Sequence, residues 1–294
     1  MSRVRVGPAL QAALLMAMSA MASALQNLFI RLAGDGGIHP FEIAFFRSFF
    51  GFATMAALVL AMSRRLPATG SLARLGGSSL FHLMAMLSFF YGMTLMPLAT
   101  SSALTFTAPL FGTLAAAFFL GETVHARRWI AILAGFVGVL IVLRPGVVPI
   151  GLGPALVLFS TVAFAGVTVL VKRMTATERT ATVVFYQSLF MSFLTLPPAL
   201  AVWTMPDATM LAVLAAMGVL STLGWLGFTR AFALADASAL LPLEFVRLPV
   251  VAVLGYLAFG EVPDIWVWVG AVVIFVASLS IAHRENAADK LRSR

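Results

Sequence analysis

The sequence predicts an all-α integral membrane protein, in which ten transmembrane helices form two inverted five-helix repeats around a central cavity. Three observations predict this fold class: the composition, the length of the apolar runs and an internal repeat. Of the 294 residues, 61% are hydrophobic and 10% are charged, and the mean hydropathy is +1.02. Because a soluble domain carries about 25% charged residues, we expect lipid rather than water to be the main solvent of this chain.

The apolar residues occur in runs of roughly 18 to 24, which is the length that a helix needs to cross the hydrocarbon core of a bilayer. The runs show no alternation of apolar and polar residues, so membrane helices are expected rather than barrel strands. The apolar runs are separated by short segments that hold glycine, proline and most of the charge. The ten predicted spans are residues 10–33, 40–62, 75–96, 98–120, 127–143, 151–173, 180–203, 208–233, 237–259 and 265–283.

The first span has the features of a signal peptide at its beginning. A basic N-terminus precedes an apolar stretch in which Ala22, Ser23 and Ala24 would suit signal peptidase. Since the apolar run continues to Leu32, we expect a retained membrane helix.

The positive charges predict the orientation. With a cytoplasmic N-terminus, fifteen of the 19 Lys and Arg fall on the cytoplasmic side, Arg31 and Arg144 fall outside, and Arg47 and Arg247 fall within spans. The positive-inside rule therefore predicts a multi-pass protein of the inner (plasma) membrane with both termini in the cytoplasm. The fifteen are Arg3, Arg5, Arg64, Arg65, Arg74, Arg127, Arg128, Lys172, Arg173, Arg179, Arg230, Arg284, Lys290, Arg292 and Arg294.

An internal repeat relates the two halves of the chain. A shift of about 140 residues aligns each of the first five spans with one of the last five. Segment 44–50 then falls on segment 184–190, and Glu122 falls on Glu261. Because each repeat holds an odd number of spans, the second copy is inserted upside down, and such folds hold their substrate between the repeats near the midplane. The expected organisation is residues 1–147 for the first repeat, 148–283 for the second and 284–294 for a cytoplasmic tail.

These features resemble the drug/metabolite transporter superfamily and, within it, the ten-helix EamA-type transporters. The residues that carry the resemblance are two Gly-Glu pairs, which end at Glu122 and Glu261, and the short link that begins at Ala99 and again at Ala235. The chain is also similar to bacterial exporters of amino acids, including aromatic ones. The resemblance implies a basket in which spans 1 to 4 and 6 to 9 enclose the cavity. It does not select a substrate, because members of one fold move different compounds.

Three charged residues lie inside predicted spans, where each costs roughly 2.5 to 3.5 kcal/mol unless it has a partner or a wet cavity. Glu244 and Arg247 are spaced i, i+3 on the ninth span, so they either neutralise each other or divide between the carboxylate and the ammonium of a substrate. Arg47, on the second span, either snorkels outward, reaches Glu42 or contacts substrate.

Other polar and aromatic residues are candidates for the cavity wall. His82, on the third span, is either a proton-linked switch or a hydrogen-bonded packing residue. Further candidates either line the cavity or make hydrogen bonds between helices. They are Gln26, Asn27, Tyr91, Thr105, Tyr186, Gln187 and Trp225.

Prolines interrupt two spans that are partners in the repeat. Pro109 lies on the fourth span, and Pro242 and Pro249 lie on the ninth. Interrupted helices at corresponding positions point to a site or a hinge, so we take these prolines as hinge candidates and expect the two spans to pack together. Glu122 and Glu261, at the membrane ends, are expected to anchor loops.

Taken together, these features predict an exporter of amino acids or similar small amphiphilic metabolites that works by alternating access. A multidrug or metabolite exporter of the same fold is the alternative. A channel would need a filter-like segment, and an intramembrane enzyme would need a zinc, paired-Asp or Ser-His motif; the sequence has none of these and no cysteine. We expect no cofactor, no metal site and no nucleic-acid partner, only a small-molecule substrate and the lipid bilayer.

Overall fold

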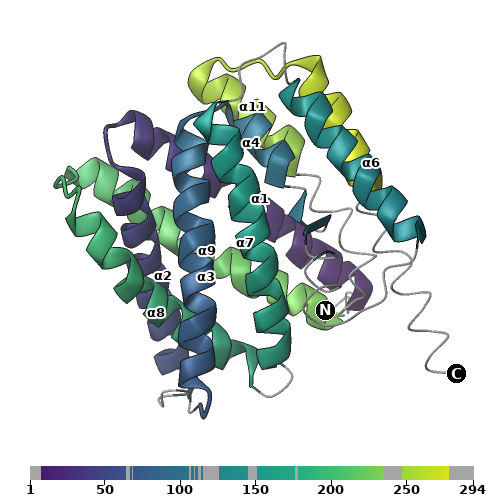
Figure 1. Ribbon diagram of the computed structural model, residues 1–294. Helices are drawn as coiled ribbons and strands as arrows, with labels where there is room; N and C mark the ends of the chain where they lie inside the picture. Colours follow the sequence, from purple (N-terminus) through teal and green to yellow (C-terminus); the bar gives the residue numbers. More distant parts are fainter. Residues whose placement is uncertain are drawn as a thin grey trace, which may run out of the picture.

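The structure, a computed structural model, describes residues 8–63, 67, 69–105, 107–108, 110–111, 114, 126–144, 151–175, 178–234 and 247–277. Within these ranges the regular elements are all helices (Figure 1). They are α1 (Pro8–Asp35), α2 (Pro40–Ser63), α3 (Leu72–Thr94), α4 (Leu98–Thr105), α6 (Ala126–Leu143), α7 (Leu152–Thr175), α8 (Thr180–Leu200), α9 (Ala208–Leu234), α11 (Arg247–Phe259) and a last helix, Ile265–Ala277.

These helices follow the ten predicted spans in order, so the all-helical fold class is confirmed. Four stretches are each long and apolar enough to cross a membrane, counting only the described residues: Leu10–Asp35, Pro40–Ala61, Ala181–Leu200 and Ala208–Phe228. The fourth and ninth spans are described only in part, through α4 and α11.

The packing of the helices has the symmetry that inverted repeats require. The first helix of one repeat packs on the third helix of the other, in both directions: α1 lies along α9, and α3 lies along α7. The second helices, α2 and α8, pack on each other, and so do α4 and α11. The expected contact between the fourth and ninth spans is therefore confirmed for the part that is described. A pseudo-twofold axis passes between α2 and α8.

Glycines let α6 cross the last helix closely at the edge of the bundle (Figure 1). A Cβ atom on Gly138 would lie 3.0 Å from the carbonyl oxygen of Gly270, and one on Gly270 would lie 2.7 Å from that of Gly138. These distances are shorter than a normal carbon contact, so only glycine fits on both sides. The two helices are the fifth of each repeat, and this equivalence again reflects the pseudo-twofold axis.

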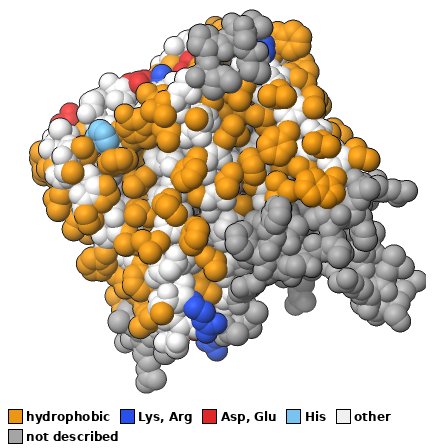
Figure 2. Space-filling view, viewed as in Figure 1, with side chains coloured by type: hydrophobic (Ala, Val, Ile, Leu, Met, Phe, Trp, Pro, Cys, Tyr) orange, Lys and Arg blue, Asp and Glu red, His pale blue; other side chains and the backbone are white. Residues whose placement is uncertain are grey.

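The surface suits a bilayer. Figure 2 shows a face that is mostly hydrophobic, with the visible charged side chains at its two ends. Leu133, Val137 and Leu140 of α6 are more than half exposed, as are Val272 and Val276 of the last helix. Exposed apolar side chains of this kind are stable in lipid, which agrees with the membrane location predicted from composition.

Carboxylates tie loops to the opposite repeat at both ends. At the upper end in Figure 1, where α1 leads into α2, Glu42 is fully buried and accepts hydrogen bonds from the N–H (2.8 Å) and hydroxyl (2.9 Å) of Thr204. At the lower end, Thr69 donates its hydroxyl to Glu178 Oε1 at 2.7 Å. Each contact joins the start of a second helix to the loop before a third helix of the other repeat.

Candidate substrate cavity

A cavity of about 290 Å³ lies in the middle of the bundle, between the two repeats. Its walls come from α1, α2, α3, α7, α8, α9 and α11, so both repeats contribute. The residues that line it are Ser19, Ser23, Gln26, Arg47, Ser48, Gly51, His82, Phe164, Val184, Gln187, Ser188, Met191, Leu220, Ser221, Thr222, Gly224, Trp225, Phe228 and Arg247. We call it the central cavity.

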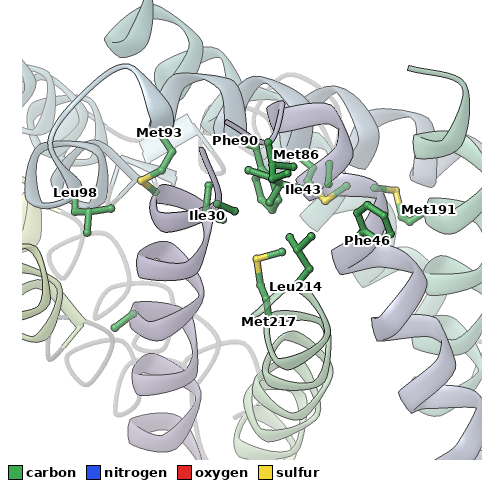
Figure 3. Close-up of a cluster of buried hydrophobic side chains, with 14 of the residues drawn as sticks. Ile30, Ile43, Phe46, Met86, Phe90, Met93, Leu98, Met191, Leu214 and Met217 are labelled. Atoms are coloured by element: carbon green, nitrogen blue, oxygen red, sulfur yellow. The ribbon is translucent and has the colours of Figure 1, made fainter. Parts of the chain in front are cut away.

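An apolar layer closes the bundle between the central cavity and the upper end. Figure 3 shows Met86 and Phe90 of α3 close to Ile43 of α2, with Leu214 and Met217 of α9 facing them. We call this layer the upper cluster. Its buried members are Ala24, Ile30, Ala33, Ile38, Ile43, Ala44, Phe46, Met86, Phe90, Met93, Leu98, Met191, Leu214, Met217 and Val251.

On α2 and α9, the central cavity lies below the upper cluster. On α2, Phe46 belongs to the cluster, whereas Gly51 lines the cavity. On α9, Met217 belongs to the cluster, whereas Trp225, two turns nearer the lower end, lines the cavity. A solute in the cavity is therefore separated from the upper end by a packed apolar layer.

At the upper end of the bundle, Arg31 and Glu261 join the ends of four helices: α1, α3, α4 and α11. Arg31 Nη1 donates to the carbonyl oxygens of Thr94 (2.9 Å) and Met96 (3.1 Å), where α3 ends. Its Nη2 lies 4.0 Å from Glu261 Oε1. Glu261 Oε2 accepts a hydrogen bond from the N–H of Leu98, the first residue of α4, at 2.9 Å. We call this set of contacts the upper latch; it agrees with the expected loop-anchoring role of Glu261.

Arg47 points into the bundle rather than outward. Its Nη1 donates to the sulfur of Met86 at 3.2 Å, and its guanidinium carbon lies 5.8 Å from the ring centre of Phe90. Its Nε has no hydrogen-bond partner among the described residues. The sequence allowed an ion pair between Arg47 and Glu42. This pair is not formed in the structure, because Glu42 accepts hydrogen bonds from Thr204. The guanidinium thus borders the cavity without a carboxylate partner in the described part of the chain.

Two further polar residues face the cavity with unused nitrogens. Gln187, on α8, is 4% exposed, and its Nε2 has no hydrogen-bond partner within the described residues. Nδ1 of His82, on α3, likewise has no hydrogen-bond partner within the described residues. The His82 ring makes a T-shaped contact with Phe164, with 6.0 Å between the ring centres. A buried donor or acceptor without a partner costs about 1–3 kcal/mol, so these atoms favour a polar ligand.

Aromatic side chains form the lower wall. Trp225 and Phe228, one turn apart on α9, stack with their ring centres 5.4 Å apart and their planes at 8°. Both line the cavity together with Phe164 of α7. Such faces bind flat or apolar groups through large contact areas. The cavity is therefore amphiphilic, because cationic, polar and aromatic side chains all line it.

Arg247 begins α11 and lines the central cavity, where its Nη2 donates to the hydroxyl of Thr105 on α4 at 2.7 Å. Thr105 thus contacts the wall of the cavity through Arg247. Glu244, the proposed partner of Arg247, lies outside the described residues, and so do Pro109 and Pro242. Pro249 lies in the first described turn of α11 and is exposed, and its role as a hinge stays a prediction.

Of the predicted candidates, Gln26, Arg47, His82, Gln187, Trp225 and Arg247 line the central cavity. Three others lie elsewhere, because they are held by neighbours. Asn27 is buried and donates to Ser102 at 3.2 Å, between α1 and α4. Tyr91 packs near the ring of His39 at the upper end. Tyr186 donates its hydroxyl to the carbonyl oxygen of Pro67 at the lower end, at 2.8 Å.

Sequence reasoning missed the serines and phenylalanines of the wall, which look like ordinary residues of membrane helices. The internal repeat could have identified some of these serines, because equivalent positions in the two repeats line the cavity. Ser48 and Ser188 are equivalent at the same offset as Arg47 and Gln187, and all four line the cavity. Groups of three or more side chains able to hold a metal ion are absent from the described residues.

An apolar helical bundle with a polar cavity at the interface of two inverted repeats is the architecture of a membrane transporter. Comparison with known families identifies the family of transporters to which the chain belongs. The EamA-like transporter family matches residues 10–144 and, a second time, residues 151–282. The chain belongs to this family, and the resemblance to the drug/metabolite transporter superfamily is confirmed.

Curated relatives are named for several substrates. An S-adenosylmethionine uptake transporter of Rickettsia felis is 30% identical over 253 residues, which are 85% of each chain. A riboflavin transporter of Vibrio cholerae is 32% identical over 195 residues, 66% of this chain and 65% of the relative. A pseudopaline exporter of Pseudomonas aeruginosa is 28% identical over 254 residues, 83% and 87% of the two chains. These names support transport of small molecules, but none of the three is a free amino acid.

A solved crystal structure shares the fold. It covers 92% of this chain and 98% of its own chain with a TM-score of 0.65, at 18% sequence identity. At this identity the similarity extends to the fold alone.

Proposed function

We propose that this transporter exports amino acids or similar small amphiphilic metabolites that carry a carboxylate. The observation that supports this most directly is Arg47, a cation that borders the central cavity without a carboxylate partner among the described residues. A guanidinium binds carboxylates through paired, charge-assisted hydrogen bonds. A substrate carboxylate would therefore satisfy the groups that the protein leaves open. The protein has no catalytic role in this proposal.

The position of the aromatic wall suits the rest of such a substrate. Gly51 of α2 and Thr222 of α9 stand side by side, since the Thr222 hydroxyl donates to the Gly51 carbonyl oxygen at 3.0 Å. Both helices run from the upper to the lower end, so Arg47 lies four residues above this level and Trp225 lies three below it. At 1.5 Å per residue, the two are separated by roughly 10 Å along the bundle. A carboxylate at Arg47 would thus leave an apolar or flat group near Trp225.

A second candidate is S-adenosylmethionine, and the observation that favours it is the similarity to the Rickettsia uptake transporter over 85% of both chains. This compound joins an amino acid to an adenosyl group, so the same Arg47 would hold its carboxylate. The volume of about 290 Å³ is slightly below the roughly 300–1,000 Å³ typical of small-molecule sites. A free amino acid fits this volume better.

Counterflow in proteoliposomes tests the proposal. We expect vesicles that contain the purified protein and unlabelled L-phenylalanine to accumulate labelled L-phenylalanine, L-tryptophan or L-methionine. The matched control is phenethylamine, which has the ring and the amine of phenylalanine without its carboxylate and should not exchange. Accumulation of S-adenosylmethionine alone would select the second candidate. Rates equal to those of protein-free vesicles for every compound would contradict both.

We propose further that the repeats 1–147 and 148–283 rock against each other in the inner membrane, with both termini in the cytoplasm. The lower end, which carries Arg74 and Arg179, is then the cytoplasmic one. Reporter fusions test this orientation. Fusions at Glu178 and Arg294 should report a cytoplasmic location, and fusions at Gly36 and Asp207 an external one. An external signal at Arg294 would contradict the arrangement.

A further inference from the structure

Arg47 and Gln187 occupy the same position in the two inverted repeats. Segment 44–50 of α2 aligns with segment 184–190 of α8 at an offset of 140 residues, and α2 packs on α8. The local structure repeats as well. Ser48 donates its hydroxyl to the carbonyl oxygen four residues earlier at 2.8 Å, and Ser188 does the same at 2.8 Å. The serines are therefore satisfied in both copies. The residues before them, Arg47 and Gln187, border the cavity and each have a side-chain nitrogen without a hydrogen-bond partner among the residues that the structure describes.

The pseudo-twofold axis places these two residues at different depths. Ser192 of α8 donates to the carbonyl oxygen of Ser48 of α2 at 2.9 Å, which sets the level of the two antiparallel helices. Arg47 lies one residue above this level, and Gln187 lies five residues below it, so their backbones are roughly 9 Å apart along the bundle. A ligand in the central cavity thus meets a cationic donor nearer the upper end and a neutral amide nearer the lower end.

We propose that Gln187 determines specificity: its amide forms a subsite for a neutral hydrogen-bonding group on the substrate, and the absence of a cation at this copy of the position restricts the substrate to one carboxylate. This inference rests on the proposed function, because it assumes that Arg47 holds the first carboxylate. Gln187 is 4% exposed and its Nε2 lacks a partner among the described residues. A carbonyl, hydroxyl or amide oxygen would satisfy this donor.

A second carboxylate is disfavoured at this subsite by desolvation. A carboxylate loses far more hydration than a neutral amide when it is buried, and a single neutral donor compensates for only part of that loss. An arginine at the same position would supply the missing charge and two parallel donors. The cavity would then hold an arginine at this position in both repeats, in addition to Arg247, and would favour dicarboxylates.

Three probes, of which the two substituted ones have nearly the same shape, test the inference by their binding to the purified, full-length protein. They are L-phenylalanine, 4-carbamoyl-L-phenylalanine and 4-carboxy-L-phenylalanine. We expect the wild-type protein to bind the carbamoyl compound at least about tenfold more tightly than the carboxy compound, which is a difference of 1.4 kcal/mol. Gln187→Arg should reverse this order. Gln187→Met, which keeps the size without the amide, should bind both substituted compounds no better than L-phenylalanine.

Exchanging the side chains at positions 47 and 187 gives a second, independent test of the inference. Arg47→Gln should weaken the binding of L-phenylalanine, and the double variant Arg47→Gln/Gln187→Arg should restore a large part of it, because the cation returns at the symmetry-related position. Phe193→Leu, on the exposed face of the same helix (67% exposed), is the control for changes in α8, and thermal unfolding monitors the fold of each variant.

The outcomes separate the two proposals. If the wild-type protein binds none of the three probes, the proposed function fails and this inference fails with it. If it binds them and Gln187→Arg leaves the ratio of the carboxy to the carbamoyl compound unchanged, or the exchange restores nothing, Gln187 is not the specificity residue and the inference alone is overturned.

Discussion

Replacing Arg47 by glutamine is expected to lower the affinity for carboxylate substrates by at least about tenfold. Hydrogen bonds to charged groups contribute about 1.5–3 kcal/mol, and 1.4 kcal/mol corresponds to a tenfold change in the dissociation constant. The effect should be at the high end of this range, because the guanidinium lies between Met86 and Phe90 rather than in water. Counterflow of L-phenylalanine over a range of concentrations measures it.

Two comparisons make the result specific to the carboxylate. Arg47→Lys keeps the charge but loses the paired donors of the guanidinium, so it should fall between the wild-type protein and Arg47→Gln. L-phenylalaninamide has no carboxylate, and its weak inhibition of counterflow should be the same in all three proteins. Equal affinity of the wild-type protein and Arg47→Gln for L-phenylalanine would show that the carboxylate binds elsewhere.

Locking the upper latch is expected to stop transport almost completely. The contacts of Arg31 and Glu261 join α1, the end of α3, the start of α4 and the end of α11, next to Met93 and Leu98 of the upper cluster. In alternating access these helix ends must separate for the cavity to open at this end. A covalent bridge between the two positions should therefore hold the protein closed at the upper end.

The absence of cysteine from the sequence makes this experiment direct. Arg31→Cys/Glu261→Cys would be treated in proteoliposomes with a reducible bis-methanethiosulfonate linker, and counterflow should fall to the level of protein-free vesicles. Transport should return when the linker is reduced, and each single-cysteine variant should be insensitive to it. If the bridged protein, checked by mass, still transports at the rate of the untreated variant, then the latch does not open during transport.

The helices and the repeat could be predicted from the sequence because neither depends on knowing which side chains meet in the folded protein. Long apolar runs require backbone hydrogen bonds to be made within each segment, so ten spans follow from composition and length. The odd number of spans per repeat then requires inversion. The same alignment also paired segment 44–50 with 184–190, and it therefore already contained the equivalence of Arg47 and Gln187.

Only the tertiary structure decided which polar side chains meet at the cavity. The period of a helix places a residue on a face, but the neighbour on that face comes from a distant part of the chain. Asn27 and Gln26 are adjacent in the sequence, yet one bonds to Ser102 and the other lines the cavity. Arg47 could have reached Glu42, but Thr204 from the other repeat takes that carboxylate. Composition and length therefore determine the spans and their inversion, whereas long-range packing determines which side chains are left for a substrate.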